Sequence, residues 1–513
     1  MKVTFLPANV SLETDGTNTI YELAIKHGIF IESPCGGNKR CNKCKVVISR
    51  GDVGEYSREE LQVLTREERE RHTRLACCFK PTEDTLVLVT GQVMEKEKVV
   101  AKEPMKHKEA RLGVALDIGT TTLEYALYNL DSNQFVFSTR FENPQRRYGA
   151  DVISRLHYMQ HAPDKVKELQ QVLLTTLNQS FAQELEGLQL KPEQIERIVC
   201  VGNTTMTHVL VNASIDSLAV APCHMVYRGG EVFKAASIGF SIHPKGKVVV
   251  LPNVEGHVGA DLLSCVLATK LGEKKGNHLL LDVGTNGEMA LVKEEEGENV
   301  LYCCSTAAGP AFEGGNLSCG MTAKVGAITR VNVLSQKLSY QVVGNVRPIG
   351  ISGSGIIDLL ACLLELGFID ETGKLEERFH GFFPLEKDGL SLSQEDIRQI
   401  QLAKGAIAAG VNMLLQRAGL TVSQMDSLTL AGAFGSNINL KHAIAIGLLP
   451  KLSVSKIKAV GNAALKGAIQ ILLQEESLEN ATRLANELTH IELANEKEFQ
   501  EEFLMELNFF RKR

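Results

Sequence analysis

The chain has 513 residues, of which 44% are hydrophobic and 23% charged, with a net charge of −6. This length allows roughly two to four domains, and the negative balance gives no reason to expect a nucleic-acid partner. No apolar run approaches a membrane span and the N-terminus lacks a signal-peptide core, so we expect no membrane association and a cytoplasmic location. In that reducing compartment the twelve cysteines should serve as metal ligands or as buried small residues, not as disulfides.

Composition divides the chain into three parts. Residues 1–93 are predicted to form a small domain of short strands with one helix, in which the helix ends at Gly28. Residues 94–110 are mostly charged with almost no apolar pattern, so we interpret them as a linker. Residues 111–513 are predicted to form a second, α/β domain with an acidic helical extension at its C-terminal end. The predicted elements of the first domain are a strand pair at 1–14, the helix at 19–28, and strands at 43–51 and 85–94.

The second domain contains an internal sequence repeat. LGVALDIGTTTLEYALY (112–128) and LLLDVGTNGEMALV (279–292) each consist of an apolar strand, an Asp-x-Gly-Thr turn and a second half-buried strand. Strand-then-helix units recur between and after the two copies. The repetition predicts a duplicated domain with two similar halves.

Cysteines cluster in the first domain. Cys35, Cys41 and Cys44 have the spacing C-x5-C-x2-C, and Cys77 and Cys78 follow in TRLACCFK. A [2Fe–2S] cluster requires four thiolates, and the plant-type arrangement takes three from one loop and the fourth from a distant position. The spacing therefore predicts a [2Fe–2S] site.

Two other readings of the cysteines fit less well. A zinc ribbon would pair one C-x2-C with another, and a redox dithiol would use Cys41 and Cys44 alone and leave the other candidates idle. Gly36 and Gly37 suit a loop that wraps closely around a cluster. The thirteen histidines show no metal-binding spacing, so we interpret them as structural or surface residues, and the remaining cysteines as buried small residues.

The first domain resembles a ferredoxin of the adrenodoxin-like spacing class. In that class the fourth ligand follows an Arg-Leu-Ala or similar run, which here precedes Cys77. The resemblance therefore implies a ferredoxin-like β-grasp fold with Cys35, Cys41, Cys44 and Cys77 as ligands. In an extended segment neighbouring side chains point to opposite faces, so Cys78 is expected to point away from the cluster.

The two Asp-Gly-Thr hairpins predict a phosphate site. Backbone N–H groups in a tight glycine turn form an anion-binding concavity, and Asp117 and Asp282, each at a strand end, can hold Mg²⁺ through water. Ordinary β-turns also use Asp-Gly and Asn-Gly, so a single copy would carry little weight. The candidate phosphate donors are Gly119, Thr120, Thr121, Thr122, Gly284, Thr285 and Asn286.

Three later glycine-rich stretches add candidates. LAGAFGSNI (430–438) predicts a strand, a turn and a helix suited to adenosine and ribose, and RPIGISGSGIIDLLA (347–361) predicts a Gly-Ser loop at a helix N-terminus. TAAGPAFEGG (306–315) contains Glu313, which we expect to be solvated and leave outside the catalytic set. The candidate nucleotide contacts in the first two stretches are Gly432, Gly435, Gly353, Ser354 and Gly355.

These motifs resemble those of the acetate and sugar kinase/Hsc70/actin (ASKHA) superfamily, over about residues 111–470. DIGTTT and LDVGTNGE resemble its two phosphate motifs, AGAFG its adenosine motif, and VGNTTM (201–206), with Asn203, its first connecting segment. The resemblance implies an actin-like ATPase that binds ATP with Mg²⁺, with Asp117 and Asp282 as the metal-holding residues.

A ferredoxin domain followed by an ASKHA ATPase resembles the reductive activators of corrinoid-dependent enzymes. That resemblance implies ATP-dependent reduction of Co(II) to Co(I) in a corrinoid protein of a methyltransferase system. The partners it implies are the corrinoid protein and a low-potential electron donor, and it allows a homodimer through the nucleotide domain.

Three other functions stay open from the sequence. The chain could be a small-molecule kinase with a fused redox sensor, which would need a base for the acceptor hydroxyl. It could activate a radical dehydratase, although such activators usually carry a shared [4Fe–4S] cluster and no ferredoxin domain. It could also be an electron carrier whose nucleotide domain binds ATP without hydrolysing it.

Overall fold

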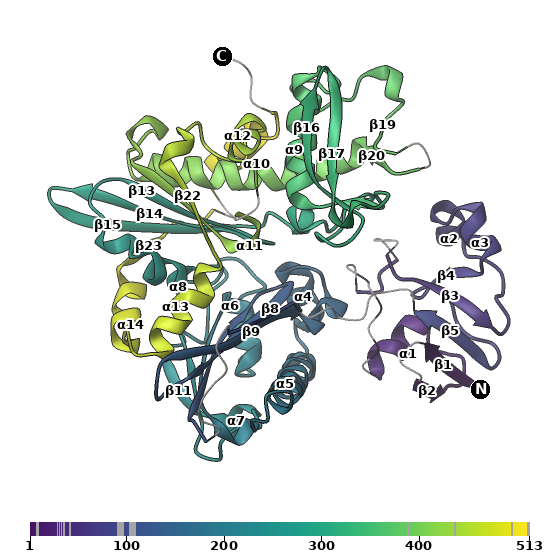
Figure 1. Cartoon of the computed structure of the whole chain (residues 1–513), viewed down its shortest axis with the longest axis horizontal. Coiled ribbons are helices and arrows are strands. Elements are labelled where there is room, and N and C mark those ends of the chain that lie inside the picture. Colours follow the sequence, from purple (N-terminus) through teal and green to yellow (C-terminus); the bar gives the residue numbers. More distant parts are fainter. Residues whose placement is uncertain are drawn as a thin grey trace.

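The computed structural model describes most of the chain as an N-terminal domain beside a larger domain of two halves (Figure 1). Three of the residues singled out above, Gly28, Cys35 and Cys41, lie outside the described residues. The described residues are 1–6, 10–27, 29, 31, 33, 36–39, 43–89, 97–101, 109–386, 389–435, 438–493 and 496–509.

The N-terminal domain is a five-stranded sheet packed against helix α1 (purple in Figure 1). The strand order is β2-β1-β5-β3-β4; β1 runs parallel to β5, and the other neighbours are antiparallel. Phe5, Leu23 and Val46 belong to its separate apolar core. Its elements are β1 Lys2–Leu6, β2 Val10–Glu13, α1 Ile20–Lys26, β3 Lys45–Arg50, α2 Arg58–Val63, α3 Arg66–Glu70, β4 Thr73–Leu75 and β5 Thr85–Val89.

The expectation of a single helix in this domain is wrong. Helices α2 and α3 follow β3, and α2 begins with a capping box in which Ser57 and Glu60 bond each other's backbone N–H groups. That Ser-x-x-Glu pattern is readable in the sequence as a helix start. Helix α1 ends at Lys26, with His27 as its cap.

The first half of the larger domain is built on a seven-stranded sheet of order β11-β12-β10-β7-β8-β9-β6. Strands β7, β8 and β9 form an antiparallel meander, β10 lies parallel to β7, and β12 lies parallel to β10. The elements of this half are β6 Glu97–Val100, β7 Leu112–Ile118, β8 Thr122–Asn129, β9 Gln134–Glu142, the 3₁₀ helix η1 Pro144–Tyr148, α4 Val152–Met159, α5 Pro163–Glu186, β10 Ile195–Gly202, α6 Thr204–Leu210, β11 Glu231–Lys234, α7 Ala235–Ile238, β12 Lys247–Val250 and α8 Ala260–Thr269.

The second half repeats this plan. Its six-stranded sheet has the order β22-β21-β13-β14-β15-β23. Here β13, β14 and β15 form the meander, and β21 and β22 add in parallel beside β13. The matching topologies confirm the predicted duplication.

The second half also carries a small three-stranded sheet, β17-β16-β18, beside helix α9. The elements of this half are β13 His278–Val283, β14 Gly287–Glu295, β15 Glu298–Thr306, the 3₁₀ helix η4 Pro310–Glu313, β16 Ala327–Leu334, β17 Lys337–Val342, β18 Gly350–Ile351, α9 Gly353–Glu365, β19 Phe382–Pro384, β20 Ser391–Ser393, α10 Gln394–Arg417, β21 Ser427–Ala431, α11 Gly432–Gly435, α12 Leu440–Ala445, β22 Ile457–Gly461, α13 Ala463–Leu472, α14 Leu478–Glu487, β23 Leu488–His490 and α15 Lys497–Met505.

Helices α8 and α13 pack between the two sheets and share one apolar core with both. They pack very closely: a Cβ on Gly467 of α13 would come within 2.2 Å of the Ser264 carbonyl oxygen of α8. The Ser264 hydroxyl donates to the Ala464 carbonyl at 2.6 Å across the same contact. This pair of helices therefore sets the distance between the halves.

Part of the predicted linker is a strand. Residues Glu97–Val100 form β6, which pairs antiparallel with β9 from Glu97↔Arg140 to Val100↔Phe137. The Lys98 ammonium also pairs with Glu184 of α5 at 2.6 Å. This segment is thus an edge strand of the first half and not a free tether. Among the described residues, no helix combines the length and apolar character needed to cross a membrane.

A buried ion pair holds the segment that carries Cys77. Arg74, 3% exposed, donates through Nε and Nη2 to the two carboxylate oxygens of Glu60, each at 2.8 Å. The Leu75 amide also donates to Glu60 at 2.9 Å. Burial by itself raises the Glu60 pKa, but these hydrogen bonds and one from the Ser57 amide outweigh it and hold the pKa below its ordinary value. The pair is therefore charged at neutral pH.

Replacing Arg74 by Met leaves the Glu60 carboxylate buried without its ionic partner. We expect strand β4 to lose about 3–5 kcal/mol of local stability, measured by native-state hydrogen exchange of the Leu75 amide in the full chain. Because the Glu60 pKa is lowered on folding, the carboxylate's contribution is present at neutral pH and is lost as the pH falls through that lowered value.

The matched control is Arg66→Met, which breaks an exposed pair with Glu70 whose side chains are 88% and 63% exposed. We expect a change below about 0.5 kcal/mol there. Adding Glu60→Leu to Arg74→Met should recover much of the loss, because the uncompensated charge is then gone. Equal effects of the Arg66 and Arg74 variants would contradict this account.

Candidate functional site

Strand pairing brings two of the predicted cluster cysteines together. Cys44 immediately precedes β3, Cys77 follows β4, and the pairing of these strands continues with the Ala76 amide donating to the Cys44 carbonyl at 2.7 Å. The two sulfur atoms lie 3.3 Å apart, and both side chains are buried. The other two predicted ligands, Cys35 and Cys41, lie outside the described residues.

Cys77 and Cys78 lie in a turn and not in the extended segment that the sequence analysis assumed. The Cys78 and Phe79 amides both donate to the Leu75 carbonyl, at 2.8 and 3.1 Å. Cys78 Sγ lies 3.9 Å from Cys77 Sγ and is only half-buried. Burial, followed by the neighbouring Cys77, raises the pKa of the Cys78 thiol to about 11.

The glycines of the cluster loop are required by close contacts. Gly37 has a φ of +83°, and a Cβ there would lie 2.6 Å from the Tyr21 ring. The Gly36 and Gly37 amides donate to the Ser33 carbonyl and hydroxyl, at 2.8 and 3.0 Å. These amides are thus bonded to Ser33, and the close wrapping of the loop around a cluster stays a prediction.

The two Asp-Gly-Thr motifs form the β7–β8 and β13–β14 hairpins, and each carries a facing pair of acids. In the first hairpin Asp117 pairs in register with Glu124, and in the second Asp282 pairs with Glu288. The Asn462 amide bridges the first pair, donating to Asp117 at 2.9 Å and to Glu124 at 3.0 Å. The duplication thus extends to the carboxylates.

A further acid, Asp261 at the start of α8, completes a concentration of negative charge. Burial, with smaller contributions from the neighbouring carboxylates, raises the pKa of Asp117 and of Glu288 well above their ordinary values. Burial raises the pKa of Asp261 to about 6, and burial together with Asp261 does the same for Asp282. Glu288 Oε1 is buried with no hydrogen-bond partner among the described residues. Such a set of acids fits a bound cation, because an added positive charge would offset both burial and mutual repulsion.

Side-chain hydrogen bonds connect the hairpins to their neighbours. The Asn203 amide, at the N-cap of α6, donates to the Thr120 hydroxyl at 2.8 Å. In the second hairpin the Thr285 hydroxyl donates to Glu313 at 3.1 Å. Glu313 was expected to be solvated; it is only partly exposed and accepts this hydrogen bond, and its place outside the catalytic set stays a prediction.

The LAGAFGSNI motif (430–438) contacts the second hairpin at Gly432. Gly432, after β21, has a φ of +82°, and a Cβ there would lie 2.5 Å from Asp282 Oδ1. Gly435 lies one helical turn later, where a Cβ would be 3.1 Å from the Leu430 side chain. Gly432 therefore lets the backbone approach Asp282 more closely than any residue with a side chain could.

The Gly-Ser loop at the start of α9 has a packing role. A Cβ on Gly355 would lie 2.3 Å from the Ile328 carbonyl of β16, and the Ser354 hydroxyl donates to the Thr329 carbonyl at 3.1 Å. Gly353 begins the helix after the capping residue Ser352. Contacts of Gly353, Ser354 and Gly355 with a nucleotide stay a prediction.

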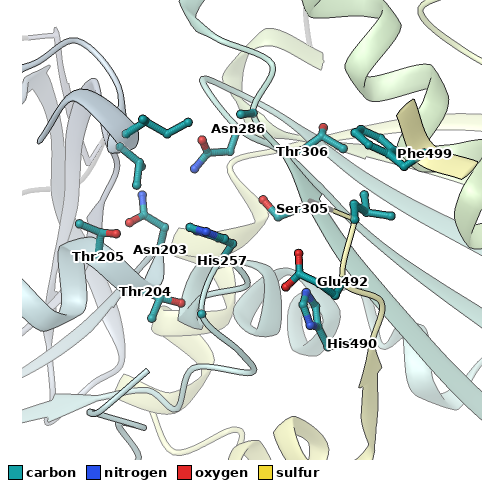
Figure 2. Close-up of a pocket in the computed structure, with 15 residues that line it drawn as sticks. Asn203, Thr204, Thr205, His257, Asn286, Ser305, Thr306, His490, Glu492 and Phe499 are labelled. Carbon is teal, nitrogen blue, oxygen red and sulfur yellow. The ribbon is translucent and has the colours of Figure 1, made fainter. Parts of the chain in front are cut away.

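A cavity of about 220 Å³ lies where the two halves meet, lined by Asn203 from the first and Asn286 from the second. Figure 2 shows His257 between Asn203 and Glu492, with His490 beside Glu492. Burial lowers the pKa of both histidines, so they are neutral at pH 7. The sequence analysis treated these histidines as structural or surface residues and missed their place in the cavity.

Among the described residues, no three His, Cys, Asp or Glu side chains are arranged to ligate a metal directly. Sequence reasoning did not name Glu124, Asp261 and Glu288, or the cavity residues His257, His490 and Glu492, as candidates, and it left Glu313 outside the catalytic set. The strand register of each hairpin predicts the two glutamates, whereas Asp261 and Glu313 come from other segments without a local signal.

Three family models match successive parts of the chain. The 2Fe-2S iron-sulfur cluster binding domain matches residues 3–82, and the RACo middle region matches residues 112–274. The C-terminal domain of RACo, described as the ASKHA domain, matches residues 276–513.

Two curated relatives extend over most of the chain. The corrinoid activation enzyme RamQ of Eubacterium limosum is 32% identical over 448 residues, which cover 82% of this chain and 74% of the relative. The [Co(II) methylated amine-specific corrinoid protein] reductase of Methanosarcina barkeri is 27% identical over 431 residues, covering 78% and 77%.

A solved structure described as a reductive activator for corrinoid, iron-sulfur protein matches the whole fold. It superposes with a TM-score of 0.71 and 28% identity, covering 99% of this chain and 98% of that one. The β-grasp and ASKHA folds implied by the motifs are confirmed. The chain belongs to the RACo family of corrinoid activators, in which a 2Fe-2S domain precedes a middle region and a C-terminal ASKHA domain.

Proposed function

We propose that this protein reductively activates a corrinoid protein: one electron passes to Co(II), regenerating Co(I), and ATP hydrolysis drives the step. The observation that carries the proposal is the presence in one chain of a 2Fe-2S domain and an ASKHA domain of the RACo family. Relatives with this architecture are named as corrinoid activators or reductases.

The energetics explain why both domains are needed. A plant-type [2Fe–2S] centre has a potential near about −400 mV, and the Co(II)/Co(I) couple lies lower still. Each further 59 mV or so lowers the equilibrium constant of a one-electron step tenfold. ATP can offset this only by binding two states of the activator, or of its complex with the corrinoid protein, with different affinity.

The N-terminal residues provide the electron site. Cys44 and Cys77 lie close enough to share one cluster, and we assign Cys35 and Cys41 as the other ligands. A bound cluster supplies one electron at a time at low potential. The Arg74–Glu60 pair keeps the Cys77 turn in place against β3.

The hairpin acids provide the nucleotide site. We assign Asp117 and Asp282, with Asp261 and Glu288 behind them, to Mg²⁺, which keeps much of its water and so is held partly through water molecules. The hairpin amides and the Thr120 hydroxyl then face the phosphates. Closing the halves would bring both hairpins to the same phosphates, which makes closure depend on ATP.

The remaining partners follow from the chemistry. An unidentified reductant of low potential must reload the cluster, since the cluster gives up its electron at each turnover. We infer a cytoplasmic setting, because free thiols persist in a reducing compartment. A homodimer through the nucleotide domain stays a prediction.

The cluster assignment predicts about two irons and two sulfides per chain in anaerobically purified protein. Cys77→Ser should abolish or distort the visible spectrum, because Cys77 faces Cys44 in the turn. Cys78→Ser, changed one position away, should leave the spectrum nearly intact. Bound zinc without iron would contradict the assignment, and the opposite behaviour of the two variants would reassign the ligand.

The nucleotide assignment predicts that Asp117→Asn and Asp282→Asn each lower ATP turnover roughly 10²- to 10³-fold and leave the cluster spectrum unchanged. Each change removes a charge from the proposed Mg²⁺ site. The matched control is Asp131→Asn, which breaks an exposed pair with Arg111 and should leave turnover unchanged. If both hairpin variants hydrolysed ATP at the wild-type rate, the assignment of Asp117 and Asp282 to the nucleotide site would be wrong.

The proposed function itself predicts that ATP, Mg²⁺ and a low-potential reductant convert a Co(II) corrinoid protein to Co(I), followed by its absorption spectrum. Cys44→Ser and Asp117→Asn should each fail, because one lacks the electron path and the other lacks ATP turnover. Co(I) formation at the wild-type rate by Asp117→Asn would show that ATP does not drive the reduction. Phosphorylation of a sugar or small acid, with no response of the corrinoid protein, would replace this function with a kinase.

A further inference from the structure

The N-terminal domain contacts both halves of the nucleotide domain next to its cluster loop. The Tyr21 hydroxyl, buried under Gly37, donates to the Arg147 carbonyl in η1 of the first half. On the other side, the Lys43 ammonium donates to the Leu317 carbonyl of the second half at 3.0 Å. Lys43, which precedes Cys44, is thus bonded to the second half. Helix α1 is bonded to the first half through Tyr21.

The first of these contacts continues directly to a phosphate hairpin. We call residues 143–159, which contain η1 and α4, the joint. Arg155 of the joint is fully buried and donates to the Gly149 carbonyl at 2.9 Å and to the Thr120 carbonyl in the hairpin. Asn143, at the start of the joint, donates to the Gly119 carbonyl at 2.8 Å.

The joint is packed on both sides. Ile25 of α1 packs against the apolar core that Tyr148 and Leu156 of the joint help to form. Val152 and Ile153 of the joint line the cavity between the halves. The same short segment therefore meets the N-terminal domain, the first phosphate hairpin and the junction of the two halves.

Charge makes this segment sensitive to an anion at the hairpin. Burial lowers the pKa of Arg155 to about 9, which leaves the guanidinium charged at neutral pH. Its Nη2 donates to the carbonyl of Thr120, whose hydroxyl we assigned to the phosphates. Phosphate charge beside it would stabilise the buried cation and hold the hairpin and the joint in one arrangement.

We propose that the joint couples nucleotide-driven closure to the docking of the cluster loop, with Arg155 as its positioning residue. The proposal rests on the proposed function in one respect, the binding of ATP between the halves. When the halves move relative to each other, the Tyr21 and Lys43 contacts move with different halves and cannot both stay unchanged. Nucleotide state thereby sets how firmly the cluster loop is held, and so when the cluster can reach a partner.

Hydrogen exchange on the cluster-loaded full chain tests the coupling without any corrinoid protein. A nonhydrolysable ATP analogue with Mg²⁺ should slow amide exchange in the hairpin at Gly119, which reports binding. It should also change exchange of peptides containing Gly36 and Gly37 by roughly 5- to 150-fold, the usual range of coupling between sites.

Three variants should separate binding from coupling. Tyr21→Phe and Lys43→Met each remove one contact, so the hairpin should still be protected while the response of the cluster loop is lost. Arg155→Lys keeps the charge but cannot donate to Gly149 and Thr120 together, so it should lose the same response while the analogue still protects the hairpin.

Matched controls make the same changes away from the interface. Tyr56→Phe removes a hydroxyl that donates to the Arg69 carbonyl inside the N-terminal domain, and Lys456→Met removes an ammonium that donates to the Met425 carbonyl inside the second half. Both should behave as wild type.

The outcomes also distinguish failure of the coupling proposal from failure of the proposed function on which it rests. If the analogue protects the hairpin of the wild-type chain but does not change exchange in the cluster loop, the proposed coupling through the joint is wrong. The proposed function is then unaffected. A full response in Tyr21→Phe and Lys43→Met would overturn the coupling as well. No protection of the hairpin by the analogue would overturn the ATP site itself.

Discussion

A cluster of acidic side chains at the junction of the two halves is the constraint on which the larger domain depends. Asp117 with Glu124, and Asp282 with Glu288, face each other in two equivalent hairpins, and Asp261 adds a fifth acid. Burial raises the pKa of four of these acids, namely Asp117, Asp261, Asp282 and Glu288, and repulsion between the carboxylates adds to it in all but Asp261. The positive charge of a nearby cation would offset both effects. In the proposed function, Mg²⁺ with a nucleotide would supply that charge and would favour closure of the two halves.

Helix packing between the two sheets positions those acids. The close packing of α8 and α13 at Gly467 and Ser264 lies between the two sheets, and Asn462 at the start of α13 bonds Asp117 and Glu124. A change in that packing would therefore move the acids of both hairpins. The duplicated topology gives each half one Asp-Gly-Thr hairpin, so under the proposed assignment a bound nucleotide would be held by equivalent elements from two sides.

An activator of this kind must link an electron site to an ATP site that lies in another domain. A few contacts make this link. Strand β6 anchors part of the predicted linker to the first half, and the hydrogen bonds of Tyr21 and Lys43 hold the cluster loop against both halves. Under the proposed coupling, these contacts connect the electron site mechanically to the larger domain. The placement of the electron site is therefore a property of the larger domain as much as of the ferredoxin fold.

Local patterns in the sequence determined the chemistry of this protein. The spacing of Cys35, Cys41, Cys44 and Cys77 and the repeated Asp-Gly-Thr hairpins are written in short segments, because a cluster loop and a phosphate turn impose their residue types on neighbouring positions. The tertiary structure decided what those segments meet. Asp261 and Glu313 contact the second hairpin from separate elements, and the histidines line the cavity. The Gly353–Gly355 loop is required by packing on β16. The contacts of Tyr21 and Lys43 bridge more than one hundred residues of chain, and such long-range packing leaves no periodic signal in either segment.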